Sequence, residues 1–82
     1  MKRQILEALN KDGGWMSGLE LVSSDPEIKR GVVYVHLMKL EDCGFVLRRP
    51  RVEKLPPEFA GLKRYEYQIT SRGRAALLRD DL

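Results

Sequence analysis

Residues 29–44, KRGVVYVHLMKLEDCG, place a basic leading end before an apolar stripe and a closing glycine, and this stretch decides the fold. Three aliphatic side chains recur there at the spacing of one helical face: Val33, Leu37 and Leu40. The pattern predicts a helix over residues 29–42 with one buried side. Gly44 stands where a left-handed C-terminal cap is favoured, so we expect the helix to end just before it.

Two strand patterns follow this helix and enclose a basic segment that is broken by prolines. The first strand is expected from Phe45 to about Arg51. The second is expected over residues 63–70, where apolar and polar residues alternate, so that one face packs on helices and the other is solvated. Residues 53–62 between them hold two adjacent prolines, which predicts a long irregular loop, here called the wing loop.

Helix signals also precede this central region. Apolar residues at helical spacing predict a first helix over residues 2–11. Ser17 and Glu20 form a capping box that starts a short second helix, which the SSDP run at 23–26 ends. Its buried side is expected to hold Leu19 with Val22 or Leu21. Residues 15–16, between the two helices, are candidates for a small extra strand.

A last helix is expected over residues 72–81, with a cap at residue 70 or 71. Its buried side is expected to hold Ala75, Leu78 and Leu82. The order of elements is typical of an α+β winged helix-turn-helix: a three-helix core, a two- to three-stranded antiparallel wing and a short C-terminal helix. The 82 residues accommodate one such domain, residues 1–82, with its wing loop at about 53–62.

Composition narrows the class of protein. Hydrophobic residues make up 43% and charged residues 33% of the chain, which is typical of a globular domain. Neither a membrane span of ~18 apolar residues nor a signal peptide is expected, because charge interrupts every apolar run. The single cysteine, Cys43, excludes an internal disulfide and favours a cytoplasmic location.

Positive charge gathers in the middle of the chain. The net charge is only +3, but residues 29–64 hold nine Lys or Arg against four Asp or Glu, whereas residues 1–28 hold three against five. A winged helix presents its third helix and its hairpin to phosphates, so this distribution favours a nucleic-acid partner. A solvated basic face is the alternative explanation.

The third helix supplies the first candidate DNA-binding group: Lys29, Arg30, Val35, His36 and Lys39. A helix fits the major groove, where residues near its start reach base edges and flanking cations contact phosphate. The alternative for this group is an ordinary solvent-facing side of a helix.

The hairpin supplies the second candidate group: Arg48, Arg49, Arg51, Lys54, Lys63 and Arg64. The planar fork of arginine binds phosphate oxygens in pairs or enters a narrow minor groove. Neighbours on a strand point in opposite directions, so not all six can face one duplex. A charged edge strand that discourages aggregation is the alternative, and both roles can hold at once.

Patterns for catalysis, cofactors or metals are missing from the sequence. One histidine, no glycine-rich phosphate loop and no workable nucleophile–base pair argue for a non-enzyme without a cofactor. Cys43 and His36 make only two ligands, too few for a zinc site, and Cys43 is expected to be a small core residue. Trp15, Tyr65 and Tyr67 are candidates for stacking on single-stranded bases, but core packing is the better interpretation of their positions.

Two motifs carry a family resemblance. The first is Y-x-x-L-x-x-L-E-x-x-G over residues 34–44, followed by two apolar residues, and the second is R-Y-x-Y-x-I-T-x-x-G-R over residues 64–74. In these residues the chain resembles the PadR-like winged-helix transcription factors. The resemblance implies DNA binding in transcriptional control. Such regulators commonly carry further C-terminal helices for dimerisation, and this sequence ends at Leu82, so a monomer and a homodimer both stay open.

We therefore expect sequence-specific binding to double-stranded DNA in transcriptional regulation, with the helix at 29–42 in the major groove and the basic hairpin on the backbone. A small phage or prophage regulator fits the same pattern. The rival hypothesis is a winged helix used as a protein-interaction or assembly module, because a fold does not fix its function. Apolar Val32 and Val35 on the outer side of the helix keep this rival open.

Overall fold

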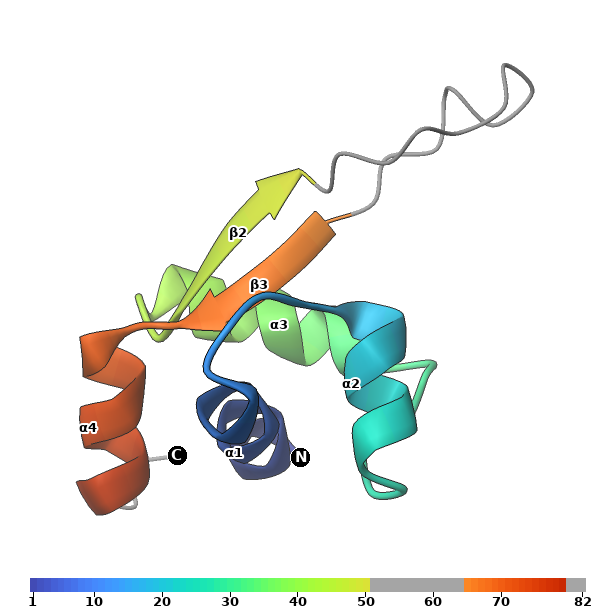
Figure 1. Cartoon of the computed structure of the whole chain (residues 1–82), viewed down its shortest axis with the longest axis horizontal. Coiled ribbons are helices and arrows are strands. Elements are labelled where there is room, and N and C mark those ends of the chain that lie inside the picture. Colours follow the sequence, from blue (N-terminus) through green and yellow to red (C-terminus); the bar gives the residue numbers. More distant parts are fainter. Residues whose placement is uncertain (51–64, 80–82) are drawn as a thin grey trace.

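The computed structural model describes residues 1–50 and 65–79, and it has the expected α+β winged-helix architecture (Figure 1). Its elements are α1 Lys2–Asp12, β1 Met16–Ser17, α2 Gly18–Ser24, α3 Val33–Asp42, β2 Val46–Pro50, β3 Tyr65–Ile69 and α4 Ser71–Arg79. The strands form one antiparallel sheet in the order β1-β3-β2. No helix in this described part is both long and apolar enough to cross a bilayer. The wing loop expected at 53–62 lies outside the described residues.

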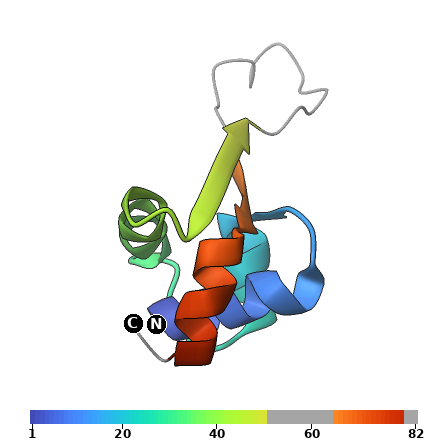
Figure 2. The ribbon, with the colours of Figure 1, turned by 90° about the vertical axis from the view of Figure 1, so that its left-hand side faces the viewer.

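The sheet has an inner and an outer face, because successive side chains of each strand point to opposite sides. Val46, Tyr67 and Ile69 lie on the inner face and are almost inaccessible to solvent. Leu47 and Arg49 lie on the outer face and are exposed. The helices pack beneath the sheet, and the β2–β3 hairpin rises from them (Figure 2).

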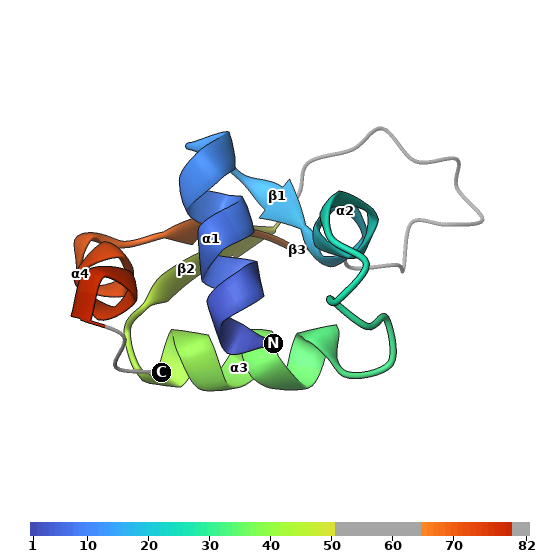
Figure 3. The same ribbon diagram turned by 90° about the horizontal axis from the view of Figure 1, so that it is seen from below.

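The hydrophobic core lies between the helices and the inner face of the sheet. Helix α1 occupies the centre, with its first turn beside α3 and with α2 and α4 on either side (Figure 3). Three helices contribute fully buried aliphatic side chains: Ile5, Leu6 and Leu9 from α1, Leu21 from α2, and Val33, Leu37 and Leu40 from α3. Burying one such side chain contributes about 1.5–3 kcal/mol. The apolar stripe expected on the third helix is therefore confirmed as part of the core.

Two helix ends follow the local signals of the sequence. At the start of α2, the Ser17 hydroxyl oxygen accepts the backbone N–H of Glu20 at 3.2 Å and donates to the Glu20 carboxylate at 3.2 Å. At the end of α3, Gly44 has φ 76° and the N–H of Phe45 donates to the Leu40 carbonyl at 2.9 Å. The capping box and the left-handed glycine cap are both confirmed.

The start of the third helix differs from the expectation. Helix α3 begins at Val33, not at Lys29, and residues 29–32 form a turn in which the Lys29 carbonyl accepts the Val33 N–H at 3.0 Å. Val32 has φ −125° and ψ −4°, outside the helical region, and no side chain caps the helix there. Gly31 and the β-branched Val32 are weak helix formers, which explains why the helix does not extend back to the basic residues.

The buried sides of the two shortest helices also differ from the expectation. In α2, Leu21 is fully buried, whereas Leu19 is 41% exposed. In α4, Ala76 is buried, whereas Leu78 is 89% exposed, and Leu82 lies outside the described residues. Helices of two turns hold too few apolar positions to fix their rotation, so the neighbouring elements decide which side is buried.

Cys43 and the aromatic residues divide between surface and core. Cys43 is exposed, so its expected core position is wrong. It follows the last turn of α3, where the glycine turn redirects the chain and leaves this side chain outside the buried stripe. Tyr67 is buried, as expected, while Tyr65 is half-buried against the core and Trp15 is half-buried.

Candidate nucleic-acid interface

The outer side of α3 is exposed and largely apolar. Val35 is 52% exposed, Met38 is 64% exposed, and Lys39 is exposed beside them. This mixture suits the edges of bases in a major groove, where thymine presents a methyl group and guanine presents acceptors. The sequence pattern identifies Val35 and Lys39 but misses Met38, because an apolar residue next to a buried stripe is normally assigned to the core.

Lys29 and Arg30 lie in the turn before α3, and both side chains are exposed. The Lys29 ammonium group donates to the Pro26 carbonyl at 3.1 Å. Both positive charges therefore stand at the leading end of α3, as the sequence suggests, but they project from a turn and not from the helix itself.

His36 belongs to α3, which packs against α1, and the charges at the start of α1 act on its imidazole. Its Nδ1 atom is buried and has no hydrogen-bond partner among the described residues. Desolvation by burial lowers the pKa of the imidazole. The positive charges of the Met1 amino group, Lys2 and Lys39 lower this pKa further. The neutral imidazole is therefore favoured near neutral pH.

Arg48 lies on the side of the hairpin that faces α3. Its Nε atom is 3.5 Å from the Glu41 carboxylate, which belongs to α3. Its guanidinium carbon lies 4.6 Å from the centre of the Tyr65 ring, close enough for a cation–π contact. The side chain is 45% exposed, so the guanidinium remains accessible to a further anionic partner.

Arg49 projects from the opposite face of β2. Its Nε donates to the Glu66 carboxylate at 2.7 Å, and its guanidinium carbon lies 4.0 Å from the centre of the Trp15 ring. Glu66 stands directly across the strand pair from Arg49, and its side chain is only 15% exposed. The Arg49 side chain is 51% exposed, so it differs from Arg48 in its shorter ion pair and in its place on the outer face of the sheet, away from α3.

The remaining basic residues of the hairpin group lie outside the described residues: Arg51, Lys54, Lys63 and Arg64. Of the group on the third helix, Val35 and Lys39 lie on the outer side of α3, and His36 lies beside α1. The structure also reveals two acidic partners that sequence spacing does not identify, Glu41 and Glu66. Only the strand register shows that Glu66 stands opposite Arg49.

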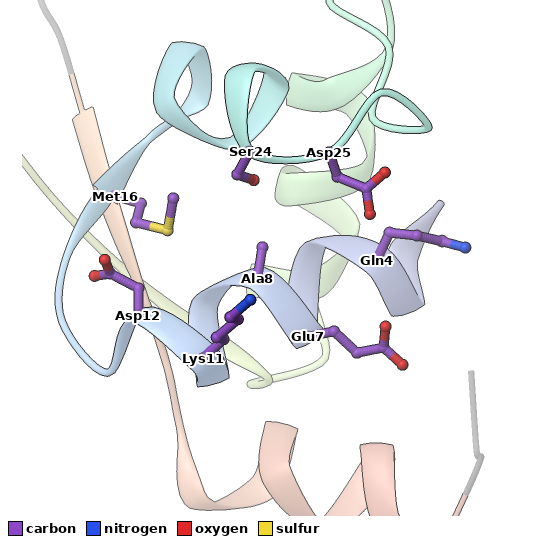
Figure 4. Close-up of a pocket in the computed structure, with 8 residues that line it drawn as sticks. All are labelled: Gln4, Glu7, Ala8, Lys11, Asp12, Met16, Ser24 and Asp25. Atoms are coloured by element: carbon purple, nitrogen blue, oxygen red, sulfur yellow. The ribbon is translucent and has the colours of Figure 1, made fainter.

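A cleft of about 570 Å³ opens between α1 and α2 (Figure 4). Its charged lining is mostly acidic, with Glu7, Asp12 and Asp25 against Lys11. Such a lining repels phosphate, so the cleft is not part of the candidate interface. No group of three metal-ligating side chains occurs in the described part of the chain.

No family model and no curated protein matches the sequence. Solved structures do match: PadR of Bacillus subtilis in complex with operator DNA has a TM-score of 0.78 and 27% identity over 99% of this chain. A putative transcriptional regulator from Thermoplasma acidophilum has a TM-score of 0.74 and 29% identity over 95% of this chain. The chain has a PadR-like winged-helix fold.

This PadR-like chain spans only part of the solved proteins that it matches. It covers 46% of the Bacillus subtilis PadR chain and 71% of the Thermoplasma acidophilum chain. A PadR family transcription regulator from Clostridium difficile has the same fold, with a TM-score of 0.75 and 21% identity over 98% of this chain and 81% of its own. The winged-helix fold that the two sequence motifs imply is therefore confirmed for the described residues, 1–50 and 65–79.

Proposed function

We propose that this PadR-like winged helix binds double-stranded DNA in a sequence-specific manner and acts in transcriptional regulation. Helix α3 enters the major groove, and the basic hairpin lies on the backbone. The observation that carries the proposal is the similarity, over 99% of the chain, to a PadR structure that holds operator DNA. The charge of residues 29–64 has the sign that such a partner requires.

The exposed outer side of α3 supports the placement of this helix. Val35 and Met38 are 52% and 64% exposed, although both are apolar, and Lys39 offers a cation at the same side. Apolar side chains that are exposed to water are unfavourable, and contact with thymine methyl groups would bury these two. Lys29 and Arg30, in the turn before the helix, are assigned to phosphate contacts.

The two arginines on opposite faces of β2 are assigned different roles, one toward DNA and one within the protein. Arg48 faces the α3 side and is assigned to a backbone phosphate. Arg49, bound to Glu66 and stacked on Trp15, is assigned to holding the hairpin against β1. The four basic residues outside the described part are assigned to phosphate contacts through their charge alone: Arg51, Lys54, Lys63 and Arg64.

A titration of duplex DNA at several salt concentrations tests the proposal. Each neutralised phosphate adds about −0.9 to the slope of log affinity against log salt, so three or more contacts give a steep dependence. Titration with random genomic duplexes measures the non-specific affinity, and titration with a selected operator measures the specific affinity. Absence of binding at low salt contradicts the proposal.

Matched variants locate the interface. Lys39→Gln removes a charge from the outer side of α3, whereas Lys11→Gln removes the same charge from the last turn of α1, at the acidic cleft. We expect Lys39→Gln to weaken DNA binding and to flatten the salt slope by about 0.9, and Lys11→Gln to change neither. Equal effects of the two variants indicate a non-specific response to net charge.

A protein-interaction role is the second candidate, and the exposed Val35 and Met38 favour it. A protein partner buries such side chains and responds weakly to salt, because few charges are paired. Val35→Ser separates the roles when it is measured on operator and on random duplexes. A loss confined to the operator supports base recognition, and no change on either duplex supports a protein partner.

The proposal also covers the type of role, the cellular location and the oligomeric state. We infer a regulatory and not a catalytic role, because the neighbours include named transcription regulators. A cytoplasmic location fits access to DNA. The treatment of residues 1–82 as one domain and the formation of a homodimer stay predictions. Light scattering of the purified chain with and without duplex measures the stoichiometry directly.

A further inference from the structure

The first turn of α1 lies beside α3 (Figure 3), and positively charged groups of both helices act on one imidazole there. Lys2 belongs to this first turn, and His36 and Lys39 lie three residues apart on α3. The charges of Lys2 and Lys39 both act on the His36 imidazole. Neither lysine forms an ion pair within the described part of the chain.

The start of α1 adds backbone donors to these side chains. The helix has 11 residues, no side chain caps its first turn, and no acidic residue lies in that turn. The first N–H groups of a helix have no partner within the helix, and its dipole places partial positive charge at the same end. Anions are stabilised at such a position.

The imidazole of His36 adds a third observation. Its Nδ1 atom is buried without a hydrogen-bond partner among the described residues, although buried nitrogen and oxygen atoms normally have one. Desolvation by burial is the largest cause of its lowered pKa, and the charged groups that lower this pKa further are the Met1 amino group, Lys2 and Lys39, all of them cationic. The imidazole therefore stands in a cationic surrounding that favours a negatively charged partner.

We propose that Lys2, His36 and Lys39 form a subsite for one backbone phosphate of DNA, and that His36 takes up a proton from solvent when the phosphate binds. This proposal rests on the proposed DNA binding and adds a residue of α1 to the interface. The phosphate offsets the repulsion among the three cations and stabilises the imidazolium, which then donates a hydrogen bond from Nε2 to a phosphate oxygen, because Nδ1 is buried. DNA affinity consequently becomes dependent on pH.

The direction of this dependence follows from linkage. A bound phosphate raises the pKa of His36 from its lowered value in the free protein, so the complex holds more protons than the free protein between these two pKa values. Affinity therefore rises as the pH falls through that interval, by at most about tenfold per pH unit for one proton. Above the pKa of the complex the affinity is constant.

The chain contains one histidine, so its imidazole resonances report on the subsite alone. We would titrate His36 by NMR between about pH 5 and about pH 8 in the free protein, with inorganic phosphate, and with a bound duplex. The expected result is a rise in its pKa with both anions. Lys2→Gln is expected to reduce the rise, whereas the matched Lys11→Gln leaves it unchanged.

DNA binding at two pH values completes the test. The unaltered chain is expected to bind more tightly at the lower pH, and His36→Gln is expected to remove the pH dependence while it retains binding at the higher pH. Binding without any rise in the pKa of His36 overturns the subsite and leaves the proposed function intact. Absence of DNA binding by the unaltered chain at low salt overturns both.

Discussion

Gly73, in α4, has no room for a side chain beside the backbone carbonyl of Phe45, which precedes β2. A β-carbon at residue 73 would overlap this carbonyl and would also lie 2.8 Å from the Ile69 side chain. The Phe45 oxygen is held in place because it accepts the Thr70 N–H at 3.0 Å. Glycine is therefore required inside a helix, where alanine is normally preferred by about 1 kcal/mol.

Gly73→Ala should destabilise the domain, because the contact involves backbone that cannot rotate away. We expect a loss of about 1–3 kcal/mol or more in the free energy of unfolding, despite the better helix propensity of alanine. Gly18→Ala is the matched control. There the new β-carbon lies 2.6 Å from the Tyr34 ring, the end of a half-exposed side chain that can move. Urea denaturation of both variants should show the larger loss for Gly73→Ala.

Leu37→Ala and Met38→Ala test the rotation of α3. Leu37 is fully buried, so its truncation should cost about 2–5 kcal/mol through lost burial and a residual cavity. Met38 is 64% exposed, so its truncation should change the stability by less than about 0.5 kcal/mol. Thermal unfolding followed by circular dichroism measures both values. Similar losses in the two variants would mean that the outer side of α3 is packed.

Arg48→Gln and Arg49→Gln test the division between the two faces of the hairpin. Arg48→Gln should weaken DNA binding and flatten the salt slope by about 0.9, because Arg48 is the residue proposed to neutralise a phosphate. Arg49→Gln should leave the slope unchanged, since this guanidinium lies on the opposite face of the sheet from Arg48, where it binds Glu66 and stacks on Trp15. The fluorescence of Trp15, the only tryptophan, should change in Arg49→Gln alone. The opposite pattern would place DNA on the outer face of the sheet.

The lowered pKa of His36 predicts a pH dependence of stability. Protonation is harder in the folded protein than in the unfolded chain, so the unfolded chain binds more protons below the ordinary histidine pKa. The contribution of His36 to stability is fully present above that value and is lost as the pH falls through the folded pKa. Melting temperatures between about pH 5 and about pH 8 should fall less steeply on the acid side in His36→Gln than in the unaltered chain.

In the hairpin, the alternation of residues predicts some side-chain orientations and leaves others open. Alternation in the second strand correctly places Tyr67 and Ile69 on the packed face, because the period of a strand is local. The same rule shows that Arg48 and Arg49 point to opposite faces. It does not show which of them faces α3, since that depends on how the sheet lies on the helices.

Short-range patterns in the chain are enough to predict the helix ends at Ser17 and Gly44, the buried stripe of α3 and the α+β order of elements. These features depend on residues a few positions apart, which the sequence displays directly. The exposure of Leu78 and the action of the Lys2 charge on His36 become visible only in the folded chain. Such relations depend on contacts between elements far apart in the chain, and packing, not local propensity, fixes which sides of those elements meet.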